Sequence, residues 1–279
     1  MKDYDLAFSM GFSCGGTMAL RKVGMQFASY PLDWIGAPGV VKTAKMVESG
    51  FANWLEREDL ELVDVRAGSF DMHVYRNRRT GFGFPHDFSS FYRLDEIFGR
   101  IREKYLRRIT RFDAHLRAAK KVFVCYIERP IDPPASDADL IEARRILSAK
   151  YPGAEFDLVY FWQENGREGF AERTVGEGIV SVACDYRRMD HGEVSHAISY
   201  GVPAEWFRRN IRVADRRTEE EKRRFAAEGG GGDNRKKRFT EGGPLRRWLD
   251  KQEYNLYRRI TRRLQERGIL PREFPLWFY

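Results

Sequence analysis

The chain is poor in the residues that build disulfide frameworks and metal clusters. Its 279 residues include 3 cysteines, which lie far apart at positions 14, 125 and 184. An odd number of widely spaced cysteines argues against a disulfide framework and for a reducing compartment. There is no CxxC pair and no clustered His/Cys spacing of the kind that binds zinc. We therefore expect neither a metal nor a cofactor.

Long apolar runs and nucleotide-binding signatures are also missing. No stretch reaches the roughly 18 consecutive apolar residues of a transmembrane helix. The first residues lack a charged region followed by an apolar one, as a secretory signal would have. We therefore expect no transmembrane segment and a cytoplasmic location. There is no GxxxxGK[ST] phosphate loop, and the glycine-rich residues 11–16 lack the GxGxxG spacing of a dinucleotide site.

Excess positive charge is absent from the first two thirds of the chain and concentrated in the last third. Residues 1–200 carry 28 Lys and Arg against 29 Asp and Glu, whereas residues 201–279 carry 21 against 12. A basic segment can bind nucleic acid, an anionic membrane surface or a polyanionic glycan, and it can also be a solvated helical face. An anionic partner would bind the basic cluster of Arg235, Lys236, Lys237 and Arg238.

Continuous apolar runs predict the fold class. Residues 122–127, 156–162 and 178–184 are typical of fully buried strands. Apolar residues at spacings of three and four predict a helix over 94–116, and a second helix is expected over 137–150. This alternation predicts an α/β fold with a central, mainly parallel sheet flanked by helices. We expect that domain to span residues 1–202. A basic helical C-terminal extension is expected over 203–279, with a glycine-rich break at 229–234.

One cysteine lies where its chemistry would be favoured. Residues 4–10 are typical of a short strand and residues 17–22 of a helix, so Cys14 lies at a strand-to-helix turn. The first turn of a helix presents unpaired N–H groups and a positive dipole end, which stabilise a thiolate. A single cysteine after a strand is more often a small buried apolar residue, and that alternative stays open. Cys125 and Cys184 lie in predicted buried strands, so we expect them to pack in the core.

A nucleophilic cysteine needs a general base, and the chain has 5 histidines. His86 is the best candidate because it lies in a predicted aromatic loop, residues 82–88, and loops carry catalytic groups more often than cores do. A structural hydrogen-bonding role for His86 is equally open. His191 and His196 are reserve candidates, since they lie in a region without clear periodicity.

Four side chains are candidates to orient that base, and the sequence does not decide among them. Asp87 is adjacent to His86. Asp33 is close in sequence to Cys14, although it could instead cap a helix or hold a loop. Asn165 and Asp185 follow buried strands, and sites in parallel sheets collect at the carboxyl ends of strands.

Four motifs resemble a known family. They are Ser9-Met10-Gly11-Phe12-Ser13-Cys14, Leu20-Arg21-Lys22-Val23-Gly24, Ser29-Tyr30-Pro31-Leu32-Asp33-Trp34 and Phe84-Pro85-His86-Asp87-Phe88. Together they resemble a bacterial family of unknown function described as papain-like cysteine peptidases, over residues 1 to about 130. Leu32 stands where that family usually has Phe. The resemblance implies Cys14 as nucleophile, His86 as base and, as an alternative fold, a papain-like α+β architecture. Members often lie among glycan-assembly genes, which implies a sugar or acyl substrate.

We therefore predict a cysteine-dependent, papain-like hydrolase or acyl transferase that acts on a small-molecule, peptide or glycan substrate. The amides of Cys14 and Gly15 would stabilise the oxyanion. One alternative is a glycosyltransferase-like or nucleotide-sugar-binding protein of bacterial polysaccharide assembly. Another is a non-enzymatic polyanion-binding module. The residues expected to bind substrate are Gly11, Ser13, Gly15, Arg21, Trp34, Asn165 and Asp185.

Overall fold

The structure is a computed structural model of the chain. It describes residues 1–66, 72–90, 92–130, 132–190, 193–215, 217–220, 222–223, 260, 263–264, 267 and 269. None of the helices in these ranges combines the length and the hydropathy needed to cross a membrane. The predicted glycine-rich break at 229–234 and the basic cluster at 235–238 lie outside the described residues.

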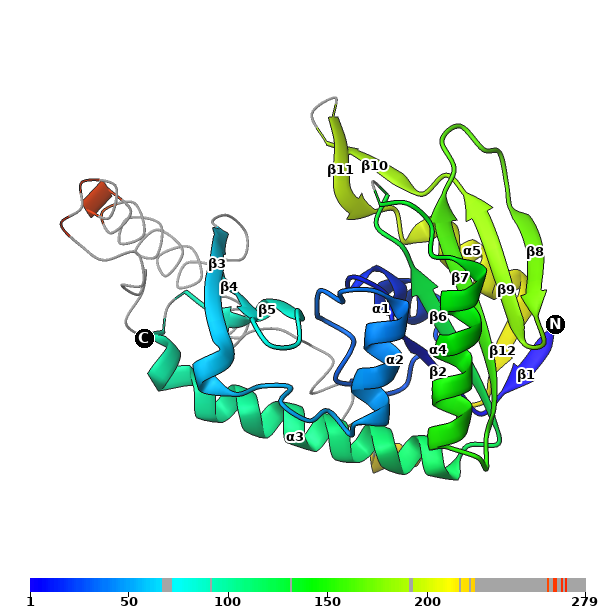
Figure 1. Cartoon of the computed structure of the whole chain (residues 1–279), viewed down its shortest axis with the longest axis horizontal. Helices are drawn as coiled ribbons and strands as arrows, with labels where there is room; N and C mark the ends of the chain where they lie inside the picture. The colour runs from blue at the N-terminus through cyan, green and yellow to red at the C-terminus, as the bar shows by residue number, and fades with distance from the viewer. Residues whose placement is uncertain are drawn as a thin grey trace.

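A five-stranded sheet forms the centre of the larger part of the molecule (Figure 1). In spatial order its strands are β2 (Leu6–Ser9), β6 (Lys121–Ile127), β7 (Glu155–Gln163), β9 (Ile179–Cys184) and β8 (Ala171–Gly176). The first four are parallel, and β8 is an antiparallel edge strand. Helices cover both faces, so the central strands are apolar on both sides and show no polar alternation. The predicted α/β class with a mainly parallel sheet is confirmed.

Two helices cover one face of this sheet and three lie on the other side. On the first face, α1 (Gly15–Lys22) and α5 (Gly201–Asn210) pack their apolar side chains against Phe123 and Phe161. On the opposite face, α2 (Val40–Glu48), α3 (Leu94–Ala118) and α4 (Asp137–Lys150) share a core with Val122 and Val124. Strands β1 (Lys2–Tyr4) and β12 (Ile211–Val213) form a separate two-stranded parallel sheet directly before β2 in the chain. Residues 203–213, assigned above to the extension, therefore pack on the sheet, and the division into two domains stays a prediction.

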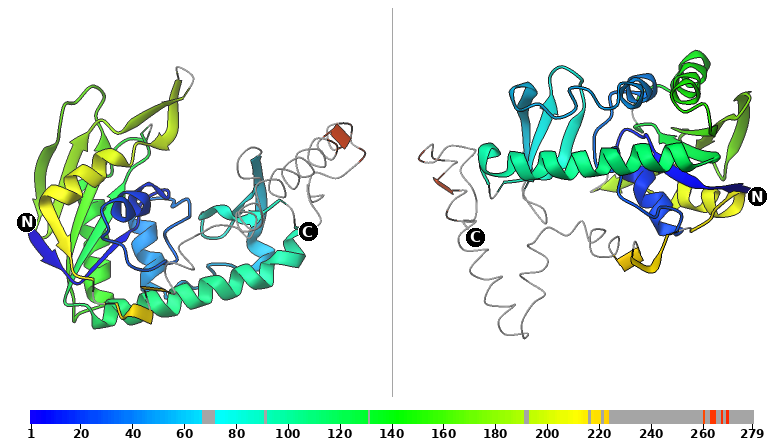
Figure 2. Two further views of the ribbon diagram at one scale, coloured as in Figure 1. Left: turned by 180° about the vertical axis from the view of Figure 1, so that it is seen from behind. Right: turned by 90° about the horizontal axis from the view of Figure 1, so that it is seen from below.

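A second, antiparallel sheet lies against the other half of α3. Its order is β3 (Leu60–Arg66), β4 (Met72–Asn77) and β5 (Gly83–Ser89), and the short helix η1 (Arg57–Asp59) precedes it. Helix α3 runs beneath both sheets, as the two further views in Figure 2 show. A hairpin of β10 (Arg187–Asp190) and β11 (Glu193–Ile198) completes the described strands. The prediction of a loop over residues 82–88 is wrong, because most of that segment is β5.

Candidate functional site

Cys14 lies at the carboxyl edge of the parallel sheet, in the turn between β2 and α1. It is the N-cap residue of α1, and its carbonyl accepts a hydrogen bond from the Met18 N–H at 2.8 Å. Its side chain is half-buried, whereas Cys125 and Cys184 are fully buried. Burial raises the pKa of each of those two thiols to about 12. Only Cys14 of the three therefore joins solvent access to a helix N-terminus.

In the turn around Cys14 the backbone lies close to β2 and to the end of β6. A Cβ atom at Gly16 would lie 2.2 Å from Ser9 Oγ, and one at Gly11 would lie 3.1 Å from the Ile127 nitrogen. Glycine at these two positions lets α1 begin directly against the ends of β2 and β6. The Gly15 N–H donates to Ser13 Oγ at 3.3 Å. One of the two amides that the sequence suggested for an oxyanion therefore already has a partner.

His86 projects from an irregular stretch of β5. Phe84 pairs with Tyr75 and Phe88 with His73, so residues 85–87 stand opposite a single residue of β4. Such a bulge re-aims side chains, and bulges are frequent beside active sites. Strand prolines are also confined to edges and bulges, which explains how Pro85 fits into β5. The His86 side chain is exposed.

The segment of residues 34–37 joins the Cys14 turn to β5. The Ala37 N–H donates to the Phe12 carbonyl at 2.9 Å, and Gly36 and Gly83 exchange two backbone hydrogen bonds of 2.7 and 2.8 Å. In the same segment the Trp34 ring meets the His86 ring edge to face, with centroids 6.0 Å apart. This segment thus links the turn that carries Cys14 to the strand that carries His86.

Asp33 is held entirely by internal donors. Its side chain is fully buried and accepts hydrogen bonds from Thr17 Oγ1 at 3.1 Å, Gln26 Nε2 at 2.7 Å and the Tyr30 N–H at 2.8 Å. Burial raises the pKa of Asp33, against the opposing effects of the Tyr30 hydrogen bond and of the nearby arginines. These contacts tie residues 26–33 to α1, which is the loop-holding alternative. An orienting role toward His86 stays a prediction.

Asp87 anchors β5 to α3. Its buried carboxylate is paired with Lys104 and accepts a hydrogen bond from the Tyr105 hydroxyl at 2.5 Å. Burial by itself would raise the pKa of Asp87, but the charges of Lys104 and Arg108 outweigh it and the net shift is downward. Asp87 is buried while its neighbour His86 is exposed. This arrangement favours an anchoring role over the predicted orienting one.

Asn165 and Asp185 lie together at the carboxyl ends of β7 and β9. Gln163 Nε2 donates to Asn165 Oδ1 at 3.2 Å and to Asp185 Oδ1 at 2.7 Å. Asp185 also accepts from the Gly166 N–H at 2.7 Å and from Arg187 at 2.5 Å. The bond from Arg187 is the main reason that the pKa of Asp185 is lowered. His191 lies outside the described residues, as does the side chain of His196.

Glu128 is a residue at this edge that the sequence analysis missed. It directly follows β6, is 9% exposed, and accepts hydrogen bonds from the Tyr160 hydroxyl at 3.1 Å and the Arg129 N–H at 3.0 Å. Burial raises the pKa of Glu128. The Arg129 guanidinium lies 5.3 Å from the centre of the Phe12 ring, which puts this cluster beside the Cys14 turn. The rule that singled out Asp185, a polar residue directly after a buried apolar run, would also have found Glu128.

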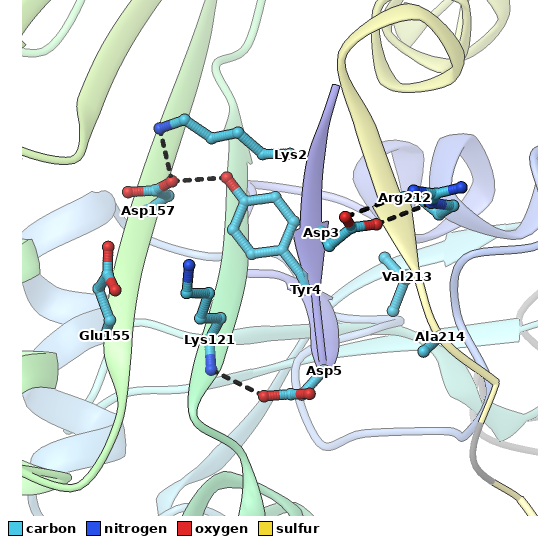
Figure 3. A pocket seen from close by; sticks show the side chains of 10 residues that line it. All are labelled: Lys2, Asp3, Tyr4, Asp5, Lys121, Glu155, Asp157, Arg212, Val213 and Ala214. Carbon is cyan, nitrogen blue, oxygen red and sulfur yellow. Dashed lines mark hydrogen bonds and ion pairs between the residues drawn. The ribbon is translucent and has the colours of Figure 1, made fainter.

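A cavity lies at the opposite, amino edge of the parallel sheet (Figure 3). Its volume is about 610 Å³. In the ranges that the structure describes, no group of three His, Cys, Asp or Glu side chains is arranged to hold a metal ion. The residues that line the cavity are Lys2, Asp3, Tyr4, Asp5, Lys121, Glu155, Asp157, Arg212, Val213 and Ala214.

Comparison with known proteins covers the part of the chain that contains Cys14, Asp33 and His86. A family model described as "Putative papain-like cysteine peptidase (DUF1796)" matches residues 5–161. The uncharacterized protein R408 of Acanthamoeba polyphaga mimivirus is 27% identical over 137 residues, which cover 44% of this chain and 61% of the viral protein. The chain therefore spans less than two thirds of that relative. No solved structure matches this chain.

Proposed function

The chain belongs to the family described as "Putative papain-like cysteine peptidase", and from that membership we propose a cysteine-dependent hydrolase or acyl transferase. Cys14 is the nucleophile and His86 the general base. The observation that carries the proposal is the hydrogen-bonded path from Phe12 through Ala37 and Gly36 to Gly83. That path links the backbone next to Cys14 to the strand that carries His86, which supports a catalytic pair formed by two groups far apart in sequence.

The proposed reaction has two halves. His86 takes the proton of Cys14, and the thiolate attacks the acyl carbon, so that an S–C bond forms and the carbonyl electrons move onto oxygen. The Cys14 amide stabilises that oxyanion, together with the Gly15 amide once it exchanges Ser13 Oγ for the oxyanion. His86 then gives the proton to the leaving amine or alcohol as its bond to carbon breaks, which leaves a thioester on Cys14. In the second half His86 deprotonates water, or an acceptor in the transferase case, whose attack on the thioester releases the product and the thiol.

Trp34 is the proposed positioning residue for the base. Its edge-to-face contact holds the His86 ring. Trp34 follows Asp33 directly, and the three internal donors on Asp33 fix the backbone from which the ring projects. In this proposal the buried Asp33 carboxylate therefore positions His86 indirectly, through Trp34.

Iodoacetamide labelling as a function of pH, read at each cysteine by mass spectrometry, tests the proposed pair. We expect Cys14 to label with an apparent pKa well below ~8.5, the value of a free thiol. In His86→Ala that apparent pKa should return toward the free-thiol value. Cys125 and Cys184 serve as internal controls, since both are buried.

His115→Gln is the matched control, because His115 lies in the last turn of α3 and contacts Tyr30. Its Cys14 labelling profile should follow that of the wild type. Labelling of Cys14 only after unfolding would refute the nucleophile. A profile that His86→Ala leaves unchanged would refute the base.

A further inference from the structure

Three cationic side chains lie around two buried carboxylates, Asp33 and Asp87. Arg21 of α1 lies with its Nη2 3.8 Å from Asp33 Oδ2, and Lys104 of α3 is paired with Asp87. Arg108 lies one helical turn after Lys104, with its guanidinium 5.7 Å from the centre of the Tyr105 ring. The charge of Arg108 counteracts the rise in the pKa of Asp33 and helps to lower the pKa of Asp87.

This basic cluster, defined as Arg21, Lys104 and Arg108, holds more positive charge than its carboxylates can neutralise. Asp87 is committed to Lys104. The oxygens of Asp33 accept hydrogen bonds from uncharged donors and form a longer ion pair with Arg21, whose Nη2 also donates to Ser29 Oγ at 3.1 Å. Within this partly buried cluster, three cations thus stand against two carboxylates. Such a region attracts an anion.

Arg108 also presents a buried donor that no group in the described ranges satisfies. Its Nη1 atom is buried and has no hydrogen-bond partner in the part of the chain that the structure describes. A buried donor without an acceptor is costly, and each such group calls for an explanation. The planar guanidinium fork matches the paired oxygens of a carboxylate or a phosphate.

The cluster is linked to His86 through the two residues Trp34 and Asp87. The Arg21 guanidinium lies 5.1 Å from the centre of the Trp34 ring, and that ring contacts His86. Lys104 in turn pairs with Asp87, the residue directly after His86. We propose that Arg21 and Arg108 bind an anionic group, a carboxylate or a phosphate, on the substrate that Cys14 attacks. The proposal rests on the proposed function and adds the substrate class, an acyl compound that carries a negative charge.

Binding of inorganic phosphate and of succinate at low salt, measured by calorimetry, tests this site. We expect the wild-type protein to bind at least one of them, and Arg108→Gln to weaken that binding about tenfold or more, as the loss of a charge-assisted hydrogen bond predicts. Arg107→Gln, an exposed neighbour on α3, is the matched control and should bind as the wild type does. Binding of phosphate alone assigns a phosphate group, and binding of succinate alone assigns a carboxylate. Failure of the wild type to bind either anion overturns the proposal, as does equal binding by Arg108→Gln.

Cys14→Ser separates this inference from the function on which it rests. It should bind the anion as tightly as the wild type, because the cluster does not include the thiol. If Arg108→Gln does not fold, the wild type still decides. Phosphate should then slow alkylation of Cys14 by the anionic iodoacetate more than by the neutral iodoacetamide. Equal slowing of both reagents, or none, overturns the anion site and leaves the nucleophile untouched.

Discussion

The two edges of the parallel sheet differ in what their polar groups do. At the amino edge the cavity is large, yet its groups bind one another. Lys2 Nζ and the Tyr4 hydroxyl lie 3.0 and 2.5 Å from Asp157 Oδ2, and Arg212 Nε lies 2.7 Å from Asp3 (Figure 3). At the carboxyl edge, the half-buried Cys14 and the buried Glu128 lie in the loops that follow β2 and β6.

This difference shows that the volume of a cavity does not determine whether the residues that line it can act on a ligand. Asp5 of the amino edge accepts the backbone N–H groups of Lys120 and Lys121, both at 2.9 Å. Its role there is to fix the start of β6. The carboxyl edge is where ligands of parallel sheets bind, because strand ends and helix N-termini converge there. We therefore assign function to that edge and structural support to the amino edge.

The largest expected contrast between the edges is in activity. Cys14→Ala should lower the release of p-nitrophenol from p-nitrophenyl acetate by about a thousandfold or more, because the nucleophile is lost. Tyr4→Phe at the amino edge should lose about 1 kcal/mol of stability with its hydrogen bond to Asp157 and keep its rate. A fall in rate for Tyr4→Phe as large as that for Cys14→Ala would reverse the assignment of the edges.

The next contrast concerns packing tolerance. Gly16→Ala should lower the free energy of unfolding by about 2–3 kcal/mol, because its methyl group would meet Ser9 Oγ at 2.2 Å. Gly99→Ala is the control, since nothing lies within 4 Å of a Cβ there, and in the interior of α3 it should add about 0.5–1 kcal/mol. Urea denaturation of both variants measures the two values. A neutral Gly16→Ala would mean that the Cys14 turn is looser than its geometry indicates.

A smaller contrast lies in the pH dependence contributed by buried carboxylates. Burial raises the folded-state pKa of Glu128, so its contribution to stability is full below its unfolded pKa and is lost as pH rises through the folded one. Glu128→Gln should therefore flatten the stability curve from acidic to neutral pH, with a change of about 1 kcal/mol. Asp87→Asn should act in the opposite sense, because the pKa of Asp87 is lowered and its contribution is lost as pH falls. Denaturation at a series of pH values distinguishes these slopes, and parallel curves for the two variants would contradict the assignment.

The smallest effect is expected at the rim of the amino-edge cavity. Arg212 and Asp3 form an ion pair in which both side chains are 68% exposed. Arg212→Gln should leave the free energy of unfolding near that of the wild type, since exposed ion pairs contribute little. A loss as large as that expected for Tyr4→Phe, measured by the same denaturation, would indicate that the cavity rim supports the sheet more strongly than its exposure suggests.

Buried strands were predictable from the sequence because their apolar runs have a single cause. Strands β6, β7 and β9 are covered on both faces, and continuous hydrophobicity follows directly from that. Strand β5 was not predictable, because its bulge and Pro85 give it the composition of a loop. The pairing of β1 with β12 joins segments that lie far apart in the sequence, and no local pattern encodes such a pairing.

The candidate site was predictable only in part, for a similar reason. Cys14 stands out because a strand-to-helix turn can be recognised locally. Arg108 does not, because it is one of many arginines on an amphipathic helix, and its buried nitrogen becomes visible only when α3 meets β5 and the segment around Asp33. The role of such an arginine depends on its neighbours in space, and the spacing of residues along the sequence does not reveal it.

The pairing of β2 with β6 sets the order in which the molecule can assemble. Leu6 of β2 pairs with Val122 of β6, whereas Val122 also pairs with Phe156 of β7, which is much nearer to it in sequence. The entropy of closing a loop grows with its length, so β6 and β7 can pair before β2 joins them. A chain emerging from the ribosome would therefore carry a cysteine on an unstructured segment until β6 had formed. The turn that carries Cys14 would therefore form among the last parts of the sheet, when β2 joins β6.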